Sequence, residues 1–328
     1  MDLELLQERA RIIRQIRSFF DAKDYLELDT PLMSPDLIPE SCLEVFEANR
    51  ILPDGTSKPL WLIPSPEIWM KKLIAQHGVN MYQICKCFRN GESTGFLHSP
   101  EFTMLEYYTM DSGYRESLAL TEELFAFLLH SGECAPFTRI TVAEAFSRYA
   151  GFDLFTAAEK PGALEAEARR LGLEQPLNGK AHGTAVLYDL IFIHTIEPQL
   201  KKDKPVVLID YPAFVPCLAQ QNPDGKTVQR WELYWNGIEL ANCYSEETNA
   251  EKVRDFFNSE AASKKEHSLV KHKVDPLYWK YFLQGETGNK NKPFPRCSGV
   301  ALGLDRLIMA LCGKSSIDSV LPFPPSKK

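Results

Sequence analysis

Arg89 follows a stretch in which large apolar residues alternate with others, and it opens a polar loop that contains glycine. A second such stretch returns after the loop and carries Glu101 and Glu106 among large apolar side chains. This pattern predicts a β-hairpin over residues 81–110. A guanidinium at a strand end can form paired hydrogen bonds with a phosphate or a carboxylate, and carboxylates across the hairpin can hold a cation. The alternative is an exposed hairpin with a solvated arginine.

Two further glutamates, Glu232 and Glu239, flank Asn236-Gly237, a dipeptide that strongly favours a tight hairpin turn. A two-residue turn pairs Glu239 with Tyr234 and places Glu232 diagonally opposite Glu239 on the same face. Two carboxylates this close repel each other unless a cation lies between them, and the apolar residues around them indicate a buried sheet. We therefore favour a divalent metal ion at this position over a solvent-exposed acidic face.

A second arginine occurs near the C-terminus, where residues 298–309 read SGVALGLDRLIM. We expect a glycine-containing strand that enters an apolar helix, with Arg306 in the first helical turn. Glycines in a strand allow the backbone to approach a flat ligand closely.

Another junction between strand and helix carries Ser65, Pro66 and Glu67. We expect Ser65 to be the N-cap, Pro66 to take the first helical position and Glu67 to lie near the positive end of the helix dipole. Glu67 fits helix stabilisation and ligand binding equally well.

The elements that would position these residues follow from the spacing of apolar side chains. Helices are predicted over residues 5–24, 68–74, 114–130, 142–149, 162–171 and 187–196, with a lysine-rich helix and connector at 249–284. Short strands are predicted within 25–30 and 34–59, and a buried strand is predicted at 206–210.

The composition limits the class of protein. The chain has 328 residues and 44% hydrophobic residues, enough for one large domain or two. Its eight cysteines show no C-x-x-C spacing and no leader-like segment precedes them, so we expect reduced thiols, no structural zinc and a cytoplasmic protein. No apolar run approaches the roughly 20 residues that span a bilayer. The net charge of −7 argues against a broad nucleic-acid surface.

Arginines at strand ends, paired carboxylates and a glycine-containing strand are the components of a nucleotide site. The chain contains neither G-x-x-x-x-G-K-[ST] nor a strand followed by G-x-G-x-x-G. A nucleotide would therefore bind on an antiparallel sheet, held by arginines and a metal ion.

Three segments, in this order, resemble the motifs of class II aminoacyl-tRNA synthetases, most closely the lysyl-tRNA synthetase branch. Thr30-Pro31 after the long helix is similar to the first motif, FRNGE with HSPEFTMLEYY to the second, and GVALGLDR to the third. The segment WELYWNGIELANCYSE resembles the lysine-type core between the last two motifs. The resemblance covers nearly the whole chain. It implies an α+β fold with an antiparallel sheet flanked by helices, as a single catalytic domain over residues 1–328.

Within this branch the chain is most similar to truncated lysyl-tRNA synthetase paralogues. It begins almost directly with the first helix of the core, so we expect no anticodon-binding domain. Ala301 stands where lysyl-tRNA synthetases usually have the middle of three glycines, as in the paralogues. Its methyl group would reshape the amino-acid pocket and disfavour α-lysine against an isomer with a shifted amino group.

The resemblance implies an ATP-dependent ligase that adenylates lysine or β-lysine and transfers it to a lysine side chain of the translation protein elongation factor P. It also implies magnesium as a cofactor and a homodimer, with tRNA not expected as a substrate. The alternatives are a truncated core that aminoacylates tRNA and a regulatory paralogue without catalytic activity.

The resemblance also implies roles for individual residues. The two catalytic residues would be Arg89, on the α-phosphate and the substrate carboxylate, and Arg306, on the γ-phosphate. Phe102 would stack on adenine, and Glu232 with Glu239 would hold magnesium. The remaining ATP-binding residues would be Asn90, Gly91, Glu92, Ser99, Leu240 and Gly303, together with Glu239. The amino-acid pocket would consist of Ser65, Pro66, Glu67, Glu106, Tyr108, Asn242, Glu246 and Ala301.

The chain departs from the family pattern in a few places. Gly91 stands where the second motif usually has glutamate, Glu92 follows it, and the loop is one residue longer. Ser99 replaces the usual asparagine, and Cys243 and Glu247 replace a glycine and a leucine next to the pocket. These departures concern the identity of the substrate more than the adenylation chemistry.

Overall fold

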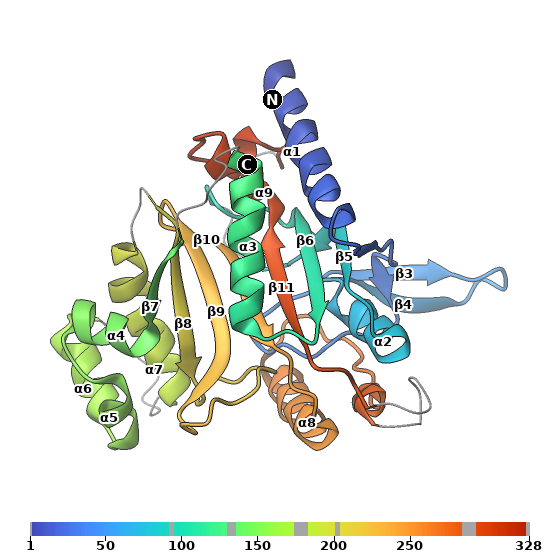
Figure 1. The fold of residues 1–328 in the computed structure, drawn as a ribbon. Coiled ribbons are helices and arrows are strands. Elements are labelled where there is room, and N and C mark those ends of the chain that lie inside the picture. Colours follow the sequence, from blue (N-terminus) through green and yellow to red (C-terminus); the bar gives the residue numbers. More distant parts are fainter. Residues whose placement is uncertain are drawn as a thin grey trace. The chain divides into compact units, whose positions relative to one another are not determined.

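The computed structural model describes residues 2–91, 95–129, 136–173, 183–200, 204–283 and 293–325. The chain forms two compact units (Figure 1). Unit 1 comprises Met1–Cys134 and Ser245–Lys328, and unit 2 comprises Ala135–Tyr244. Among the described residues, no helix is both long enough and apolar enough to cross a membrane.

Four strands of unit 1 are hydrogen-bonded in the order β1 (Leu26–Glu27), β5 (Met81–Phe88), β6 (Glu101–Met110) and β11 (Cys297–Gly303). β5 and β6 form the antiparallel hairpin that the alternation predicts, and β11 lies antiparallel to β6. β1 pairs with β5 in parallel. The third motif therefore lies directly beside the second.

Two helices cover one face of these strands. The ring of Phe20 in α1 (Leu3–Asp21) stacks on Tyr82 with the ring centroids 4.7 Å apart. The Tyr107 hydroxyl lies 2.7 Å from the Thr121 hydroxyl in α3 (Tyr114–Leu129). Because side chains alternate along a strand, the neighbours of Tyr82 and Tyr107 point to the opposite face. That face carries the predicted pocket residue Glu106.

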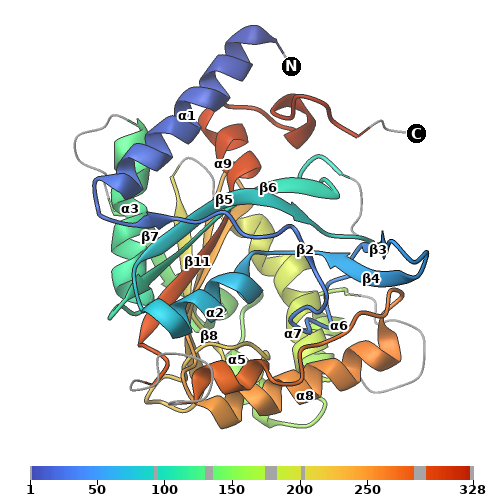
Figure 2. The same cartoon turned by 90° about the vertical axis from the view of Figure 1, so that its right-hand side faces the viewer.

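The predicted helix after the second junction is α2 (Glu67–His77), and the view of Figure 2 looks onto it. Its N-cap is Pro66, so the prediction of Ser65 at this position is wrong by one residue. The Pro66 carbonyl accepts the first helical hydrogen bonds, from the amides of Trp69 and Met70. The helix ends at Gly78, which has a left-handed conformation with φ 58°.

The remaining elements of unit 1 surround α2 and the strands. A small sheet has the order β2 (Met33–Ser34), β4 (Ser57–Leu62) and β3 (Glu47–Ile51). The helical elements are α8 (Ala250–His267), the 3₁₀ turn η4 (Tyr278–Phe282), α9 (Leu304–Leu311) and the 3₁₀ turn η5 (Ile317–Ser319). α9 follows β11 directly, so Arg306 lies in the first turn of the helix, as expected.

Unit 2 has strands in the order β10 (Ile238–Ser245), β9 (Thr227–Trp235), β8 (Val206–Pro212) and β7 (Thr138–Thr141). The turn at Asn236-Gly237 forms as predicted, with Ile238 opposite Trp235 and Glu239 opposite Tyr234. The helical elements are α4 (Val142–Ala145), η1 (Phe146–Ala150), α5 (Leu154–Glu159), α6 (Ala163–Arg170), α7 (Thr184–Ile191), η2 (Phe192–Ile196) and η3 (Glu197–Gln199). Their apolar side chains form one core with the strands of the unit.

Both units combine mixed strands with helices, which confirms the predicted α+β class. β7 and α5 were not predicted, because each is too short for a clear period. The predicted helices at 142–149 and 187–196 each consist of an α-helix followed by a π-helical turn.

Candidate active site

Three neighbouring strands of unit 1 bring the predicted pocket residues Glu106, Tyr108 and Ala301 to one face. Glu106 of β6 lies between Gln83 of β5 and Ala301 of β11 in the register of the sheet. The methyl group of Ala301 therefore stands beside the Glu106 side chain. Tyr108, two residues further along β6, donates from its hydroxyl to Glu106 Oε1 at 2.7 Å.

Gly299 lies opposite Tyr108 on β11 and leaves room for two side chains. A Cβ atom on Gly299 would lie 2.5 Å from Glu246 Oε1 and 2.5 Å from the Tyr108 ring. Only glycine therefore allows Glu246 to reach this face of the sheet.

α2 contributes Glu67 and, one turn later, Lys71, a residue that the sequence analysis did not identify as a site residue. Lys71 has 1% of its side chain exposed. Its Nζ lies 2.5 Å from Glu67 Oε1 and 2.7 Å from Glu246 Oε2. Glu67, Lys71, Glu106, Tyr108 and Glu246 are called the Lys71 cluster below.

Burial dominates the electrostatics of the Lys71 cluster. It raises the pKa of Glu246 to about 7 even though the nearby Lys71 ammonium lowers it. Burial and the charge of Glu67 raise the pKa of Glu106 well above its usual range. Burial lowers the pKa of Lys71, but the charges of Glu246 and Glu67 outweigh this and raise it well above its usual range. The cluster therefore holds one firmly charged ammonium, and burial favours the neutral forms of Glu106 and Glu246.

Several buried polar atoms around the Lys71 cluster have no hydrogen-bond partner among the residues that the structure describes. They are Gln83 Oε1, Glu106 Oε2 and the Tyr278 hydroxyl. Tyr278 stacks on Phe257 at 4.7 Å between ring centroids, and the charges of the cluster act on its hydroxyl. Buried polar atoms are normally paired, so these three indicate a polar ligand with hydrogen-bond donors.

Arg89 lies at the end of β5, and its guanidinium carbon is 5.3 Å from the centre of the Phe102 ring. The next residue, Asn90, donates from its side-chain amide to the Val45 carbonyl at 3.3 Å and accepts from the Gly91 amide at 2.9 Å. These contacts anchor the first part of the loop. Arg89 and Phe102, predicted to contact phosphate and adenine, thus lie together in unit 1. Glu92 lies outside the described residues.

Arg306 is held at the start of α9, where its Nε donates to the Leu97 carbonyl at 3.1 Å. The preceding residue, Asp305, is buried, lies 2.6 Å from Arg9 Nη1 and accepts from the Thr103 amide at 2.6 Å. α9 is therefore fixed to both α1 and β6. Two other predicted ATP-binding residues also lie in unit 1. Gly303 is the N-cap of α9, and Ser99 is buried.

Unit 2 carries the predicted magnesium ligands. Glu239, Tyr234 and Glu232 share a face of the β9–β10 hairpin, as predicted, but a bulge at Leu240 places Asn242 directly opposite Glu232. The buried Glu232 accepts hydrogen bonds from the Tyr211 hydroxyl at 2.6 Å, the Tyr234 hydroxyl at 2.7 Å and Arg230. Tyr211, Arg230, Glu232 and Tyr234 are called the Arg230 cluster below.

The donor set of unit 2 fits magnesium. Glu232 and Glu239 supply carboxylate oxygens on one face, the ligand type that this ion prefers. Each carboxylate oxygen has two lone pairs, so Glu232 Oε1 can accept from Arg230 and still face a cation. Asn242 adds a buried amide oxygen, Oδ1, that has no hydrogen-bond partner within the described part of the chain.

Two departures from the family pattern have a structural explanation. Glu247 accepts from the amides of Thr248 and Asn249 at 3.0 Å each and pairs with Lys252 at 3.0 Å, so it organises the start of α8. Cys243 is a buried residue of β10 with 1% exposure. Neither residue belongs to the Lys71 cluster.

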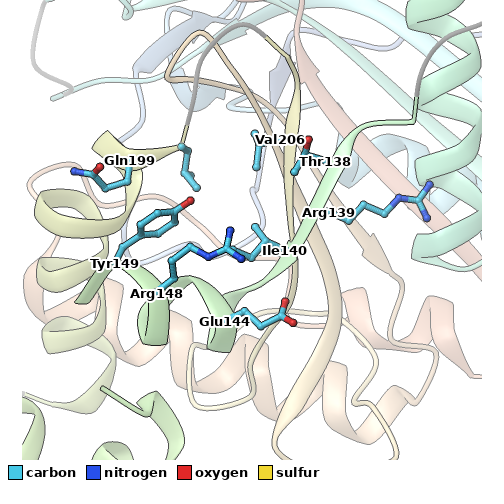
Figure 3. Close-up of a pocket in the computed structure, with 9 residues that line it drawn as sticks. Thr138, Arg139, Ile140, Glu144, Arg148, Tyr149, Gln199 and Val206 are labelled. Atoms are coloured by element: carbon cyan, nitrogen blue, oxygen red, sulfur yellow. The ribbon is translucent and has the colours of Figure 1, made fainter. Parts of the chain in front are cut away.

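A separate cavity of about 500 Å³ lies within unit 2 and contains none of the predicted site residues. Figure 3 shows Arg148 and Tyr149 beside Ile140 and Val206 in this cavity, while Arg139 points away. Arg148 and Arg139 are both exposed, so the cavity has no buried charge to select a ligand.

Comparison with known proteins identifies the family of this chain. Residues 3–327 match the family model described as tRNA synthetases class II (D, K and N). An elongation factor P–(R)-β-lysine ligase of Avibacterium paragallinarum is 35% identical over 98% of this chain and 95% of its own length. Proteins with the same name from Vibrio cholerae and Mannheimia succiniciproducens are 35% and 33% identical over 97% and 98% of the chain and 94% and 95% of their own lengths. These similarities confirm the resemblance inferred from the three motifs.

Proposed function

Because the chain belongs to the class II tRNA synthetases of the D, K and N type, we propose that it is an ATP-dependent ligase acting on a protein. It activates β-lysine as an adenylate and transfers it to a lysine side chain of elongation factor P. The names of its relatives, which align over nearly their whole length, support this substrate pair.

The charge of the Lys71 cluster is the observation that supports a diamino acid as the substrate. Three carboxylates, from Glu67, Glu106 and Glu246, face a single ammonium, that of Lys71. Two negative charges thus lack a counterion when all three acids are ionised. A diamino acid brings two ammonium groups, and a substrate without the second amine would leave a buried carboxylate unpaired.

The reaction proceeds in two displacements at positioned groups. An oxygen of the β-lysine carboxylate attacks the α-phosphorus of ATP, a bond to phosphorus forms and pyrophosphate leaves. Arg89 contacts both the carboxylate and the α-phosphate, and Arg306 contacts the γ-phosphate, so positive charge lies where negative charge builds up. The amine of the acceptor lysine, in its neutral form, then attacks the adenylate carbonyl. AMP leaves, and the amine loses a proton as the amide forms.

The remaining assignments belong to the same proposal. Phe102 stacks on adenine, while Asn90, Gly91, Ser99 and Gly303 line the nucleotide site. Glu232 and Glu239 hold Mg²⁺, which neutralises triphosphate charge when bound. Ser65 and Pro66 complete the amino-acid pocket. The protein acts in the cytoplasm as a homodimer with one catalytic domain per chain, and tRNA is not its acceptor.

Mass spectrometry of the two possible acceptors tests the proposed function. The enzyme is incubated with ATP, Mg²⁺ and (R)-β-lysine, and elongation factor P or tRNA is added in parallel. We expect elongation factor P to gain the mass of one β-lysyl group and tRNA to remain unchanged. Charging of tRNA alone would identify a synthetase instead, and the absence of ATP-dependent product with every diamino acid would favour a regulatory paralogue.

Replacing Arg306 tests the nucleotide site separately. Arg306→Ala removes the cation proposed for the γ-phosphate, and we expect pyrophosphate exchange to fall by about 100-fold or more, as for other positioned charges in a transition state. Arg296→Ala, at a partly exposed arginine in the same unit, serves as the control. Full exchange in Arg306→Ala would show that the assigned ATP site is wrong.

A further inference from the structure

Lys71 is an unusual residue for the interior of a protein. Lysine is almost never fully buried unless its charge is paired, and Lys71 has 1% exposure. It lies on the packed side of α2 between Met70 and Ile74, both of which are also buried. Its four-carbon stem thus fills core space while its ammonium reaches the pocket.

The ammonium of Lys71 pairs with one oxygen of Glu67 and with one oxygen of Glu246. It contacts Glu67 Oε1 and Glu246 Oε2, while Glu246 Oε1 points the other way, toward Gly299. On the same face of the sheet, Glu106 Oε2 has no hydrogen-bond donor within the described ranges. Lys71 therefore contributes to the orientation of Glu246 through Oε2, while Oε1 lies beside Gly299.

We propose that Lys71 is a specificity-determining positioning residue for the reaction proposed above. Its ammonium orients Glu67 and Glu246 and favours the ionised form of Glu246, so that the pocket binds amino acids with two ammonium groups and rejects those with one. Lys71 itself does not contact the reacting atoms. This inference rests on the proposed function for the identity of the substrate, and on the ion pairs of Lys71 for its mechanism.

The surroundings of Glu246 explain why a permanent cation is needed. The ionisable groups that face it are Glu67 and Lys71 from α2, Glu106 and Tyr108 from β6, Tyr278 from η4 and Cys297 from β11. Lys71 is the only cation among these described groups. Even with it, burial raises the pKa of Glu246 to about 7. Without it, Glu246 would be neutral at neutral pH, and a neutral acid attracts an ammonium group no more than an amide does.

Calorimetric titration without ATP tests the proposal independently of catalysis. The dissociation constants of (R)-β-lysine and of an analogue lacking one amine are measured for the complete chain across a pH series spanning neutrality. For the unchanged protein, we expect β-lysine to bind more tightly as the pH rises through about 7, where Glu246 loses its proton. We expect the analogue to bind weakly throughout.

Lys71→Met keeps the volume of the side chain and removes its charge. We expect the midpoint of the pH dependence to rise by about one unit or more, and the preference for β-lysine over the analogue to fall at least about tenfold at neutral pH. Lys72→Met is the matched control, because Lys72 is adjacent on α2 but pairs with Asp275 at 3.1 Å instead. It should leave both quantities unchanged.

Glu67→Gln gives a second test with the opposite sign, and it applies if Lys71→Met fails to fold. The charge of Glu67 raises the pKa of Glu246, so its removal should move the midpoint to lower pH. The proposal for Lys71 would be overturned if Lys71→Met changed neither the midpoint nor the preference for β-lysine. It would also be overturned if Glu67→Gln left the midpoint unchanged. Failure of the unchanged protein to exchange pyrophosphate with any diamino acid would instead overturn the proposed function, and the binding data would still report on Lys71.

Discussion

The Lys71 cluster in unit 1 and the Arg230 cluster in unit 2 both bury carboxylates beside a cation, but their charges balance differently. In the Arg230 cluster, one carboxylate meets one guanidinium and two hydroxyl donors. In the Lys71 cluster, three carboxylates share one ammonium, and Glu106 Oε2 lacks a donor among the residues described. Glu232 thus has a cation and two donors of its own, whereas the Lys71 cluster has more carboxylates than ammonium groups.

This difference predicts that substitutions in one cluster affect the stability of the protein and that substitutions in the other affect its substrate specificity. Burying a charge is expensive unless its partners compensate it, and removing one partner leaves an uncompensated charge in the interior. We therefore expect substitutions of Arg230 or of the hydroxyl donors to Glu232 to act mainly on the free energy of unfolding, whereas Glu232 itself is also a proposed Mg²⁺ ligand. Changes in the Lys71 cluster should act mainly on the choice and affinity of the amino acid, because its acids can accept protons when no substrate is bound.

The largest effect should come from Arg230→Met. This substitution leaves the buried Glu232 without its cation, and breaking such a pair typically costs about 3–5 kcal/mol of unfolding free energy. Burial and the charge of Glu232 raise the pKa of Tyr211 well above its usual range, so this hydroxyl stays a donor but cannot replace the lost charge.

Urea unfolding measures this cost, with Arg148→Met as the control. Arg148 is an exposed arginine of the same unit, and its replacement should change the unfolding free energy by no more than about 0.5 kcal/mol. If Arg230→Met lowers the free energy of unfolding no more than Arg148→Met does, the Arg230 cluster is not a stabilising network.

Glu246→Gln should give the next largest effect, now on the substrate. An amide cannot balance an ammonium group, and losing one partner of a buried charge contact costs about 2–5 kcal/mol, so we expect kcat/KM for β-lysine to fall by about 100-fold. The unfolding free energy should change less, because Lys71 keeps its ion pair with Glu67.

The neighbouring Glu247 offers a matched control for Glu246→Gln. Its carboxylate binds the first amides of α8 and Lys252, so Glu247→Gln should weaken the start of this helix without changing kcat/KM for β-lysine. Equal losses of activity in the two variants would mean that the effect of Glu246→Gln is structural.

The sequence predicted the two hairpins well because their signals are local. Alternation predicts β5 and β6, and Asn236-Gly237 predicts the turn between β9 and β10. The bulge at Leu240 could not be read in advance, since it depends on how both strands pack. It leaves Glu232 and Glu239 on one face but gives Glu232 a new partner across the hairpin, Asn242.

The main omission was Lys71, although a signal was present. It lies four residues after Glu67 and between apolar positions of α2, so a lysine at this spacing faces the core rather than solvent. Its second partner, Glu246, is distant in the sequence, and only the folding of unit 1 brings the two together. Predicting the ion pair would have required the tertiary structure.

Ala301→Gly tests whether the strand beside Glu106 contributes to specificity as well. Removing the methyl group widens the pocket at the position opposite Glu106. One methyl group in a pocket is typically worth about 1–3 kcal/mol, so the ratio of kcat/KM for α-lysine to that for β-lysine should rise about tenfold. Pyrophosphate exchange with each isomer gives this ratio. An unchanged ratio would mean that the methyl group of Ala301 does not contribute to specificity. Of the features tested in unit 1, only the charges of the Lys71 cluster would then remain as determinants of specificity.

The smallest expected effects compare two tyrosines that each donate to a buried glutamate. Tyr234→Phe removes a donor of Glu232, and Tyr108→Phe removes the donor of Glu106 Oε1. One hydrogen bond to a buried charged group is worth about 1.5–3 kcal/mol, and less where the acid is neutral. Tyr234→Phe should therefore lower the free energy of unfolding while the KM for β-lysine stays the same. Tyr108→Phe should raise this KM by about fivefold with little loss of stability, because burial and the charge of Glu67 raise the pKa of Glu106 well above its usual range and so favour its neutral form in the empty pocket. If both variants lose stability to the same extent and neither changes the KM, the two clusters are alike and the excess carboxylates do not select the substrate.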